Sequence, residues 1–270
     1  MRSPSPARPA APTSRWPSLG LRTIAIGYLL ALLVIPVGMV FYRAFEHGFA
    51  AAWDAVTTPP AQHAFYLTCI ITLIAVPANA IFGVLTAWVL ARYDFRGKRI
   101  LDVLIDLPFA LPTIVAGLVL LALYGPNGPV GINIAYTRVA VLMALLFITL
   151  PFVVRAVQPV LIALERDVEE AAESLGAKPL TIFRRIILPA LTPALLAGVG
   201  LAFGRAVGEF GSIVLISGNL PYKTEVASVL VYAQIESDNA TGAAAISVVL
   251  LLASLVLLSV LTLAGRRWVR

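Results

Sequence analysis

The sequence predicts an all-α integral membrane protein with six transmembrane helices, on the strength of three observations. The chain of 270 residues is 60% hydrophobic and 13% charged, whereas soluble domains average about 45–50% apolar and about 25% charged residues. Six apolar runs each approach the ~20 residues that a helix needs to cross a bilayer. Lysine and arginine gather in alternate connections between these runs, which is typical of a polytopic membrane domain.

The six expected spans form one transmembrane domain over residues 23–270. They follow one another along residues 24–42, 64–90, 104–124, 139–160, 191–216 and 243–264. Residues 1–22 are rich in Pro, Ser, Ala and Arg, and are expected to form a disordered cytoplasmic tail. The first apolar run is longer than a secretory signal core and lacks a convincing cleavage site, which favours an uncleaved span. Prolines interrupt several spans, which bundled membrane helices tolerate.

The distribution of positive charge predicts the topology. The three loops on one side carry only Arg43, Arg138 and Lys223. The other side carries many more basic residues, in the tail, in two connections and at the C-terminus: Arg2, Arg8, Arg15, Arg22, Arg92, Arg96, Lys98, Arg99, Arg155, Arg166, Lys178, Arg184, Arg185, Arg266, Arg267 and Arg270. The positive-inside rule therefore places both termini and the loop 161–189 in the cytoplasm.

The segment Asp167–Pro189 is the longest charged interval between apolar runs. Asp167 can cap a helix, and Glu170 three residues later completes a capping-box pattern. Gly176 suits a left-handed helix stop, and Pro179 prevents the same helix from continuing. The helix would have one small apolar face at i, i+3, i+4 and i+7, formed by Val168, Ala171, Ala172 and Leu175.

A helix of this kind has two interpretations, a solvated loop helix or a docking element for another protein. Its residue pattern resembles the EAA motif of ABC importer permeases, and the matching residues are Glu170, Ala171, Ala172, Leu175, Gly176, Ile186, Leu188 and Pro189. This resemblance implies a type I importer permease fold in which the short helix is a coupling helix docked on a cytoplasmic ATPase. The adjoining segment Leu180–Leu188, with several apolar residues, could anchor it under the bundle.

Catalytic and metal-binding constellations are absent from the sequence. There is no Walker A loop, no His-Glu-x-x-His and no Gly-x-Ser-x-Gly. One cysteine, Cys69, and two histidines are not spaced as metal ligands. We therefore expect no enzyme activity and no bound metal in this chain, with ATP and Mg²⁺ bound by a partner ATPase. The basic residues reflect membrane orientation, so no nucleic acid is expected.

The fifth span carries the most informative intramembrane residues. Glycines at four-residue spacing suit close helix packing, and they are Gly200, Gly204 and Gly208. Beside them lie Arg205 and Glu209, and charges in mid-bilayer usually face a bundle interior or a wet cavity. Two compatible roles remain open: an ion pair that makes insertion tolerable, or a lining of the solute path. Further polar candidates are Ser212 and Asn79, and Asn79 could either bond across helices or line the path.

Two carboxylates lie near the start of the third span. Asp102 and Asp106 would lie at a helix N-terminus, where the dipole favours them. A role in transport is the alternative.

Four segments are similar to permeases for sulfate and molybdate oxyanions, and most of all to the T-type subunit of the sulfate/thiosulfate importer (CysTW family): Asp106–Thr113, Tyr124–Gly128, Gly204–Ser212 and Ser217–Val226. The resemblance implies a permease of an ATP-driven importer in the bacterial inner membrane. It also implies its partners: two copies of an ATPase, a second, W-type permease and a periplasmic sulfate-binding protein. A molybdate or tungstate permease is the alternative within the family, and an ATP-independent secondary transporter or channel is the alternative outside it.

Overall fold

The computed structural model describes residues 15–268, which form helices joined by loops. Five of its helical segments are long and apolar enough to cross a membrane, and the bent pair described below makes a sixth. The five segments contain α1 (Arg15–Phe45), α3 (Pro59–Arg92), α6 (Arg138–Ala163), α9 (Leu188–Val207) and α12 (Ala240–Trp268). They correspond to the first, second, fourth, fifth and sixth spans expected from the sequence. Helix α1 begins at Arg15, so residues 15–22 of the expected disordered tail are helical, contrary to the prediction. Residues 1–14 of that tail lie outside the described part of the chain.

Shorter elements fill the connections. Helix α2 (Gly48–Thr57) directly follows α1, and α11 (Ala227–Glu236) directly precedes α12. The interval between α6 and α9 holds α7 (Arg166–Ser174), α8 (Pro179–Ile182) and a π-helical turn, η1 (Phe183–Ile187). The remaining helices are α4 (Lys98–Ala110), α5 (Thr113–Tyr124) and α10 (Gly211–Ile216).

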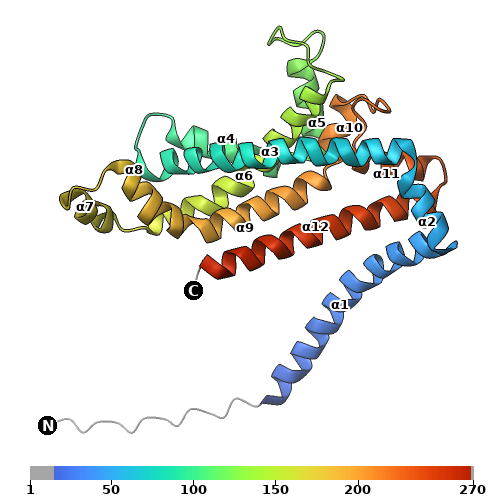
Figure 1. Cartoon of the computed structure of the whole chain (residues 1–270), viewed down its shortest axis with the longest axis horizontal. Coiled ribbons are helices and arrows are strands. Elements are labelled where there is room, and N and C mark those ends of the chain that lie inside the picture. Colours follow the sequence, from blue (N-terminus) through green and yellow to red (C-terminus); the bar gives the residue numbers. More distant parts are fainter. Residues whose placement is uncertain (1–14, 269–270) are drawn as a thin grey trace, which may run out of the picture.

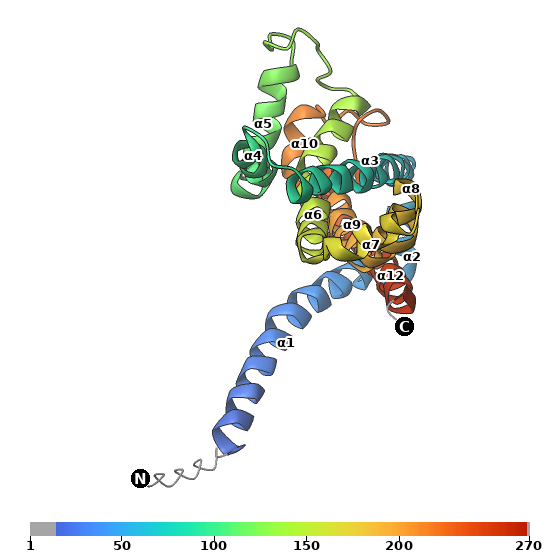
Figure 2. The same cartoon turned by 90° about the vertical axis from the view of Figure 1, so that its left-hand side faces the viewer.

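The long helices run side by side as a bundle whose two ends differ (Figure 1). Helices α7 and α8 lie at one end, and α2 and α11 lie at the other. The first helix leaves the bundle obliquely, as both views show (Figure 2). None of its most apolar stretch is buried by the rest of the chain, so in the membrane this face meets lipid or another protein.

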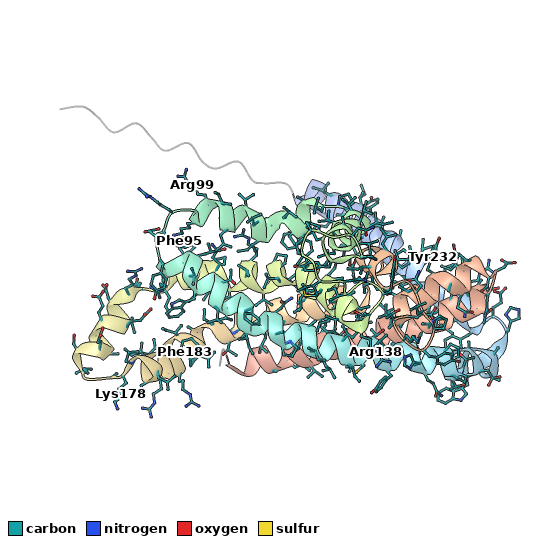
Figure 3. All side chains as sticks on the ribbon, turned by 90° about the horizontal axis from the view of Figure 1, so that it is seen from above. Phe95, Arg99, Arg138, Lys178, Phe183 and Tyr232 are labelled. Carbon is teal, nitrogen blue, oxygen red and sulfur yellow. The ribbon has the colours of Figure 1, made fainter. Side chains whose placement is uncertain are left out.

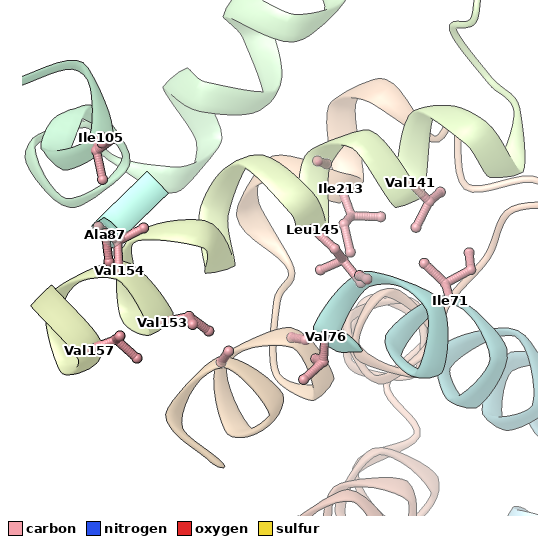
Figure 4. Close-up of a cluster of buried hydrophobic side chains, with 14 of the residues drawn as sticks. Ile71, Val76, Ala87, Ile105, Val141, Leu145, Val153, Val154, Val157 and Ile213 are labelled. Atoms are coloured by element: carbon pink, nitrogen blue, oxygen red, sulfur yellow. The ribbon is translucent and has the colours of Figure 1, made fainter. Parts of the chain in front are cut away.

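The core lies between α3, α6 and α9, with α3 and α6 sharing the most extensive interface. Figure 4 shows its side chains, among them Val76, Leu145 and Val153. A Cβ atom added to Gly83 of α3 would come within 2.8 Å of the Val153 Cβ atom of α6. The absence of a side chain at Gly83 is therefore what allows the two helices to pack this closely.

The third expected span, residues 104–124, is not one straight helix. Helices α4 and α5 meet at an angle of 118° across a short break. Leu111 adopts an extended conformation (φ −87°, ψ 136°), as expected for a residue that precedes proline. Pro112 also has no N–H with which to continue the hydrogen bonding of α4, so this proline turns the expected span into two half-helices.

The fifth expected span, residues 191–216, is also interrupted. Helix α9 ends at Val207, and α10 begins at Gly211 in a new direction. The Glu209 carboxylate accepts hydrogen bonds from the backbone N–H and the hydroxyl of Ser212, both at 2.9 Å. These bonds satisfy a donor at the start of α10 that would otherwise have no partner in the helix.

The two breaks lie next to each other, because α5 packs on α10 (Figure 1). A Cβ atom on Gly117 would lie 2.4 Å from the carbonyl oxygen of Ser212. One on Gly211 would lie 2.1 Å from the Thr113 hydroxyl oxygen. The Ile114 backbone nitrogen would also lie only 3.0 Å from that Cβ atom. Glycine is therefore required at both positions, at Gly117 by the opposing backbone and at Gly211 by the Thr113 side chain together with the backbone of Ile114.

The expected glycine stripe of α9 is only partly a packing surface. A Cβ atom on Gly200 would meet Leu258 of α12 at 3.1 Å, but one on Gly204 would lie 3.9 Å from the same residue. Gly208 has only its own helix within reach. The tight contact of α9 is at Gly198 instead, where a Cβ atom would come 2.9 Å from the Ala156 Cβ atom and 3.1 Å from the Phe152 carbonyl oxygen of α6.

This difference predicts opposite outcomes for two alanine substitutions in α9. Gly198→Ala should lower the free energy of unfolding by about 1–3 kcal/mol, because the added methyl group presses on the backbone of α6. Gly204→Ala should be neutral or slightly stabilising, since its surroundings have room and alanine favours the helix. Denaturant unfolding of the two purified variants in detergent measures both. Equal stability of the two would contradict the assigned interface.

Candidate coupling helix and intramembrane polar site

Helix α7 lies at the same end of the bundle as the labelled side chains of Lys178 and Arg99 (Figure 3). It begins at Arg166 with Glu165 as the preceding cap residue, whose side chain makes no capping bond. The expected capping box of Asp167 and Glu170 is therefore wrong. Asp167 instead lies in the first helical turn together with Glu169, where the helix dipole favours negative charge.

The predicted stop at Gly176 is confirmed. Gly176 has φ +84°, a conformation that side chains other than glycine's disfavour. Its N–H donates to the Glu173 carbonyl oxygen (2.8 Å), and the Ala177 N–H donates to that of Ala172 (3.0 Å). These are the paired bonds of a Schellman motif, so α7 has a defined end.

The expected apolar face of α7 lies open at this end of the molecule. Leu175 is 89% exposed and Val168 is 48% exposed. Ala171 is exposed as well, and only Ala172 is partly buried. Large apolar side chains on a helix outside the membrane-spanning segments usually mark an interaction surface when they gather on one face.

Polar contacts fasten α7 to the end of α3. Arg92 forms an ion pair with Glu169, and its guanidinium carbon lies 5.7 Å from the centre of the Trp88 ring. Arg166 donates to the Arg92 carbonyl oxygen at 3.1 Å. From the sequence, Arg92 is only a marker of topology, because nothing local connects it to a carboxylate 77 residues away.

The segment after α7 provides the apolar part of this attachment. Ile182 and Ile187 are buried, and the Phe183 ring packs edge-on against Trp88 at 6.0 Å. The remaining motif residues Ile186, Leu188 and Pro189 lie partly buried where η1 passes into α9. A displacement of α7 would therefore reach both α3 and α9. A cavity of about 650 Å³ between α7, η1 and α3 leaves room at this junction.

A second group of polar residues lies inside the bundle. Asn79 is 3% exposed, and its amide donates to the Thr149 hydroxyl oxygen (2.8 Å) and to the Leu146 carbonyl oxygen (2.9 Å). Of the two roles that the sequence allowed, a bond between helices is therefore the one that the structure supports. The side chain links α3 to α6 and has no exposure with which to line a path.

Arg205 and Glu209 form the ion pair expected from their spacing, with 2.9 Å between Nη2 and Oε2. The pair does not lie along one helix, because α9 ends between the two residues. The Glu209 side chain is 1% exposed, whereas that of Arg205 is 38% exposed. Ser212 bonds to the carboxylate, as described above, and is itself buried. Ser228 of α11 donates to the Glu209 carbonyl oxygen at 2.5 Å.

Asp102 and Asp106 do not act as helix-dipole partners. They lie in the second and third turns of α4, and both bind Arg155 of α6 at 2.6–2.7 Å. Arg155 also donates to the Asp102 carbonyl oxygen and to Gln158. All five N–H donors of this guanidinium are thereby used. This cluster ties α4 to the bundle.

Comparison with known proteins decides the family. Residues 79–270 match the family described as "Binding-protein-dependent transport system inner membrane component". The chain belongs to this family. The permease is 49% identical over 241 residues to the sulfate transport system permease protein CysT of Synechococcus elongatus, covering 87% of each chain. It is 41% identical over 256 residues to the Escherichia coli protein of the same description, covering 90% of this chain and 92% of that one.

Solved structures agree on the fold. One match is a chain from a bacterial ABC transporter that imports alginate, with a TM-score of 0.78 at 17% identity. The superposition covers 94% of the permease and 96% of that chain. A chain of the MetNI methionine ABC transporter matches with a TM-score of 0.55, also at 17% identity, over 78% of the permease and 97% of that chain. The expected ABC importer permease fold is therefore confirmed.

The Asn79 contact predicts a measurable coupling between two helices. In a double-mutant cycle of Asn79→Ala and Thr149→Val, the free energies of unfolding should deviate from additivity by about 0.6 kcal/mol, the average measured for bonds between membrane helices, and by no more than about 1.7 kcal/mol. Thr192→Val is the control, because the Thr192 hydroxyl bonds only within α9, to the Leu188 carbonyl oxygen. Additivity of Asn79→Ala with Thr149→Val would show that the bond does not stabilise the fold.

Proposed function

We propose that this permease is a transport subunit of an ATP-driven importer that carries sulfate, and thiosulfate with it, across the bacterial inner membrane. The observation that supports this most is its 41–49% identity to CysT proteins of sulfate transport systems over most of both chains. The chain itself binds neither ATP nor Mg²⁺ in this proposal. Both belong to a partner ATPase.

Helix α7 is the element through which the ATPase would act. Its end is fixed by Gly176 and its apolar residues Val168 and Leu175 are uncovered. Its base is fastened to α3 and η1 by Arg92, Glu169 and Phe183. A short helix that is exposed on one side and held on the other can transmit displacement from a groove on the ATPase to the spans. The binding protein would deliver the dianion on the opposite side.

The assembly would contain two ATPase copies, a second permease of the W type and a periplasmic sulfate-binding protein. A solved alginate transporter is described in complex with a ligand-bound periplasmic protein, and the family is named for dependence on binding proteins. The unburied face of α1 offers a surface for the second permease or for lipid. Both termini would lie in the cytoplasm together with α7, since basic residues concentrate at that end.

Uptake by the assembled importer tests the substrate. Proteoliposomes that contain the permease, its ATPase and its second permease should accumulate labelled sulfate only when the binding protein is outside and ATP is inside. Excess thiosulfate should compete, and molybdate should compete weakly. Strong competition by molybdate would favour a molybdate or tungstate permease, and uptake without ATP would favour a secondary transporter.

The stop of α7 gives a sharper prediction about coupling. Gly176→Val forces a β-branched residue into a left-handed conformation, at a cost of about 1–2 kcal/mol, and should unwind the end of the helix. Sulfate uptake should fall several-fold while ATP hydrolysis continues, so that fewer ions move per ATP.

Gly97→Val is the matched control, because Gly97 has φ +94° and, like Gly176, has no neighbouring atom within 4 Å of an added Cβ. It lies between α3 and α4 and outside α7. The ratio of uptake to hydrolysis should therefore stay normal in this variant. The same fall in both variants would mean that the effect is general strain and not the loss of the α7 stop.

A further inference from the structure

A cavity of about 340 Å³ lies where the two interrupted helices meet. Its wall combines the end of α4, the break before α5, the middle of α6 and the last turn of α9. The lining residues are Pro108, Phe109, Leu111, Thr113, Ile148, Phe152 and Arg205. All except Thr113 and Arg205 are apolar, so Arg205 supplies the charge in this space.

Arg205 differs from Arg155 of α6 in having unused donors. The guanidinium of Arg155 spends all of its N–H groups on Asp102, Asp106 and Gln158. Within residues 20–265, the polar contact of Arg205 is the one between its Nη2 atom and Glu209. Its side chain is 38% exposed. It can therefore present several N–H groups to the cavity, in the planar arrangement that suits a tetrahedral oxyanion.

Glu209 is held so that it moderates this charge without occupying the cavity. Its Oε1 atom accepts both bonds from Ser212, its Oε2 atom faces Arg205, and the side chain is 1% exposed. The pair is neutral overall, which makes it tolerable inside a bilayer. An anion that reaches Arg205 must compete with a fixed carboxylate, and this keeps the interaction weak enough for release.

We propose that this cavity is a transit site for a small tetrahedral oxyanion, in which Arg205 binds the anion directly and Glu209 keeps the binding weak. The inference rests on the proposed function and adds the contact inside the permease to it. Arg205 lies beside the break at Leu111–Thr113, and a movement of α4 or of α9 would change the size of the cavity. The anion would thus be held at the point where the bundle can open.

Replacing the Arg205–Glu209 pair by two neutral side chains of similar size shows whether Arg205 binds the transported anion or only forms a structural ion pair. Arg205→Gln combined with Glu209→Gln removes both charges, so a pair that serves only for membrane insertion would be dispensable in the double variant. We expect at least a tenfold lower maximal sulfate uptake, with a normal amount of protein in the membrane and normal ATP hydrolysis stimulated by the binding protein. A maximal rate equal to that of the parent would overturn the proposal.

The matched control is Arg43→Gln with Glu46→Gln. This pair has the same 2.9 Å separation but lies on the surface, at the opposite end of the bundle from α7. Sulfate uptake by this control variant should equal that of the parent. If the parent itself takes up neither sulfate nor another tetrahedral oxyanion, the proposed function fails and this inference fails with it. If the parent transports and the Arg205 variant matches it, only this inference fails.

Thiol labelling of the cavity gives a readout that does not depend on the Arg205 variant being active. Phe109 lines the cavity and is 50% exposed, and Cys69→Ser removes the native thiol. In the assembled importer carrying Phe109→Cys, a negatively charged thiol reagent should react about tenfold faster than a positively charged one of the same size, because Arg205 attracts anions. Sulfate should slow the reaction. Equal rates with both reagents and no protection by sulfate would overturn the proposal.

Discussion

Backbone polar groups must be satisfied wherever this chain lies in hydrocarbon, and this constraint governs where its helices can stop. The chain breaks twice inside the bundle, at Leu111–Pro112 and at Gly208–Phe210. Each break is protected by the other, because α5 and α10 pack with glycine against backbone. Glu209 supplies the acceptor for the start of α10. Irregular backbone at this depth is tolerated when it is buried in protein or lines a cavity. Both breaks line cavities, the first through Leu111 and the second through Gly208 and Phe210.

The same constraint explains why the polar side chains inside the bundle differ in how many of their hydrogen-bonding groups have partners. Asn79 is fully enclosed and serves as a link between α3 and α6. Arg155 is saturated by two carboxylates and fastens α4, which otherwise touches little of the bundle beyond α6. Arg205 has one carboxylate partner and keeps part of its guanidinium open to a cavity. Asn79 and Arg155 thus hold helices together, whereas Arg205 has donors free for the proposed transit site.

Local rules predicted the features that depend on local sequence. The positions of the long helices, the left-handed stop at Gly176 and the Arg205–Glu209 pair all follow from spacing over a few residues. Contacts between distant segments were missed, since Arg155 and Asp102 lie 53 residues apart and no spacing rule connects them. The bend at Pro112 was missed because a proline in a membrane helix can either be absorbed as a kink or end the helix, and local spacing does not distinguish the two outcomes. Gly117 and Gly211 became informative only once the opposing backbone was in place.

Helix α7 lies outside the membrane-spanning segments, and the proposed function requires that the partner ATPase covers its exposed face. The most direct measurement uses Leu175→Cys in a Cys69→Ser background, at the most exposed apolar position of the helix end. A thiol reagent that cannot cross membranes should label this cysteine in inside-out vesicles only, and assembly with the ATPase should protect it. Labelling from the outside of intact cells, or labelling that is unaffected by the ATPase, would contradict the account.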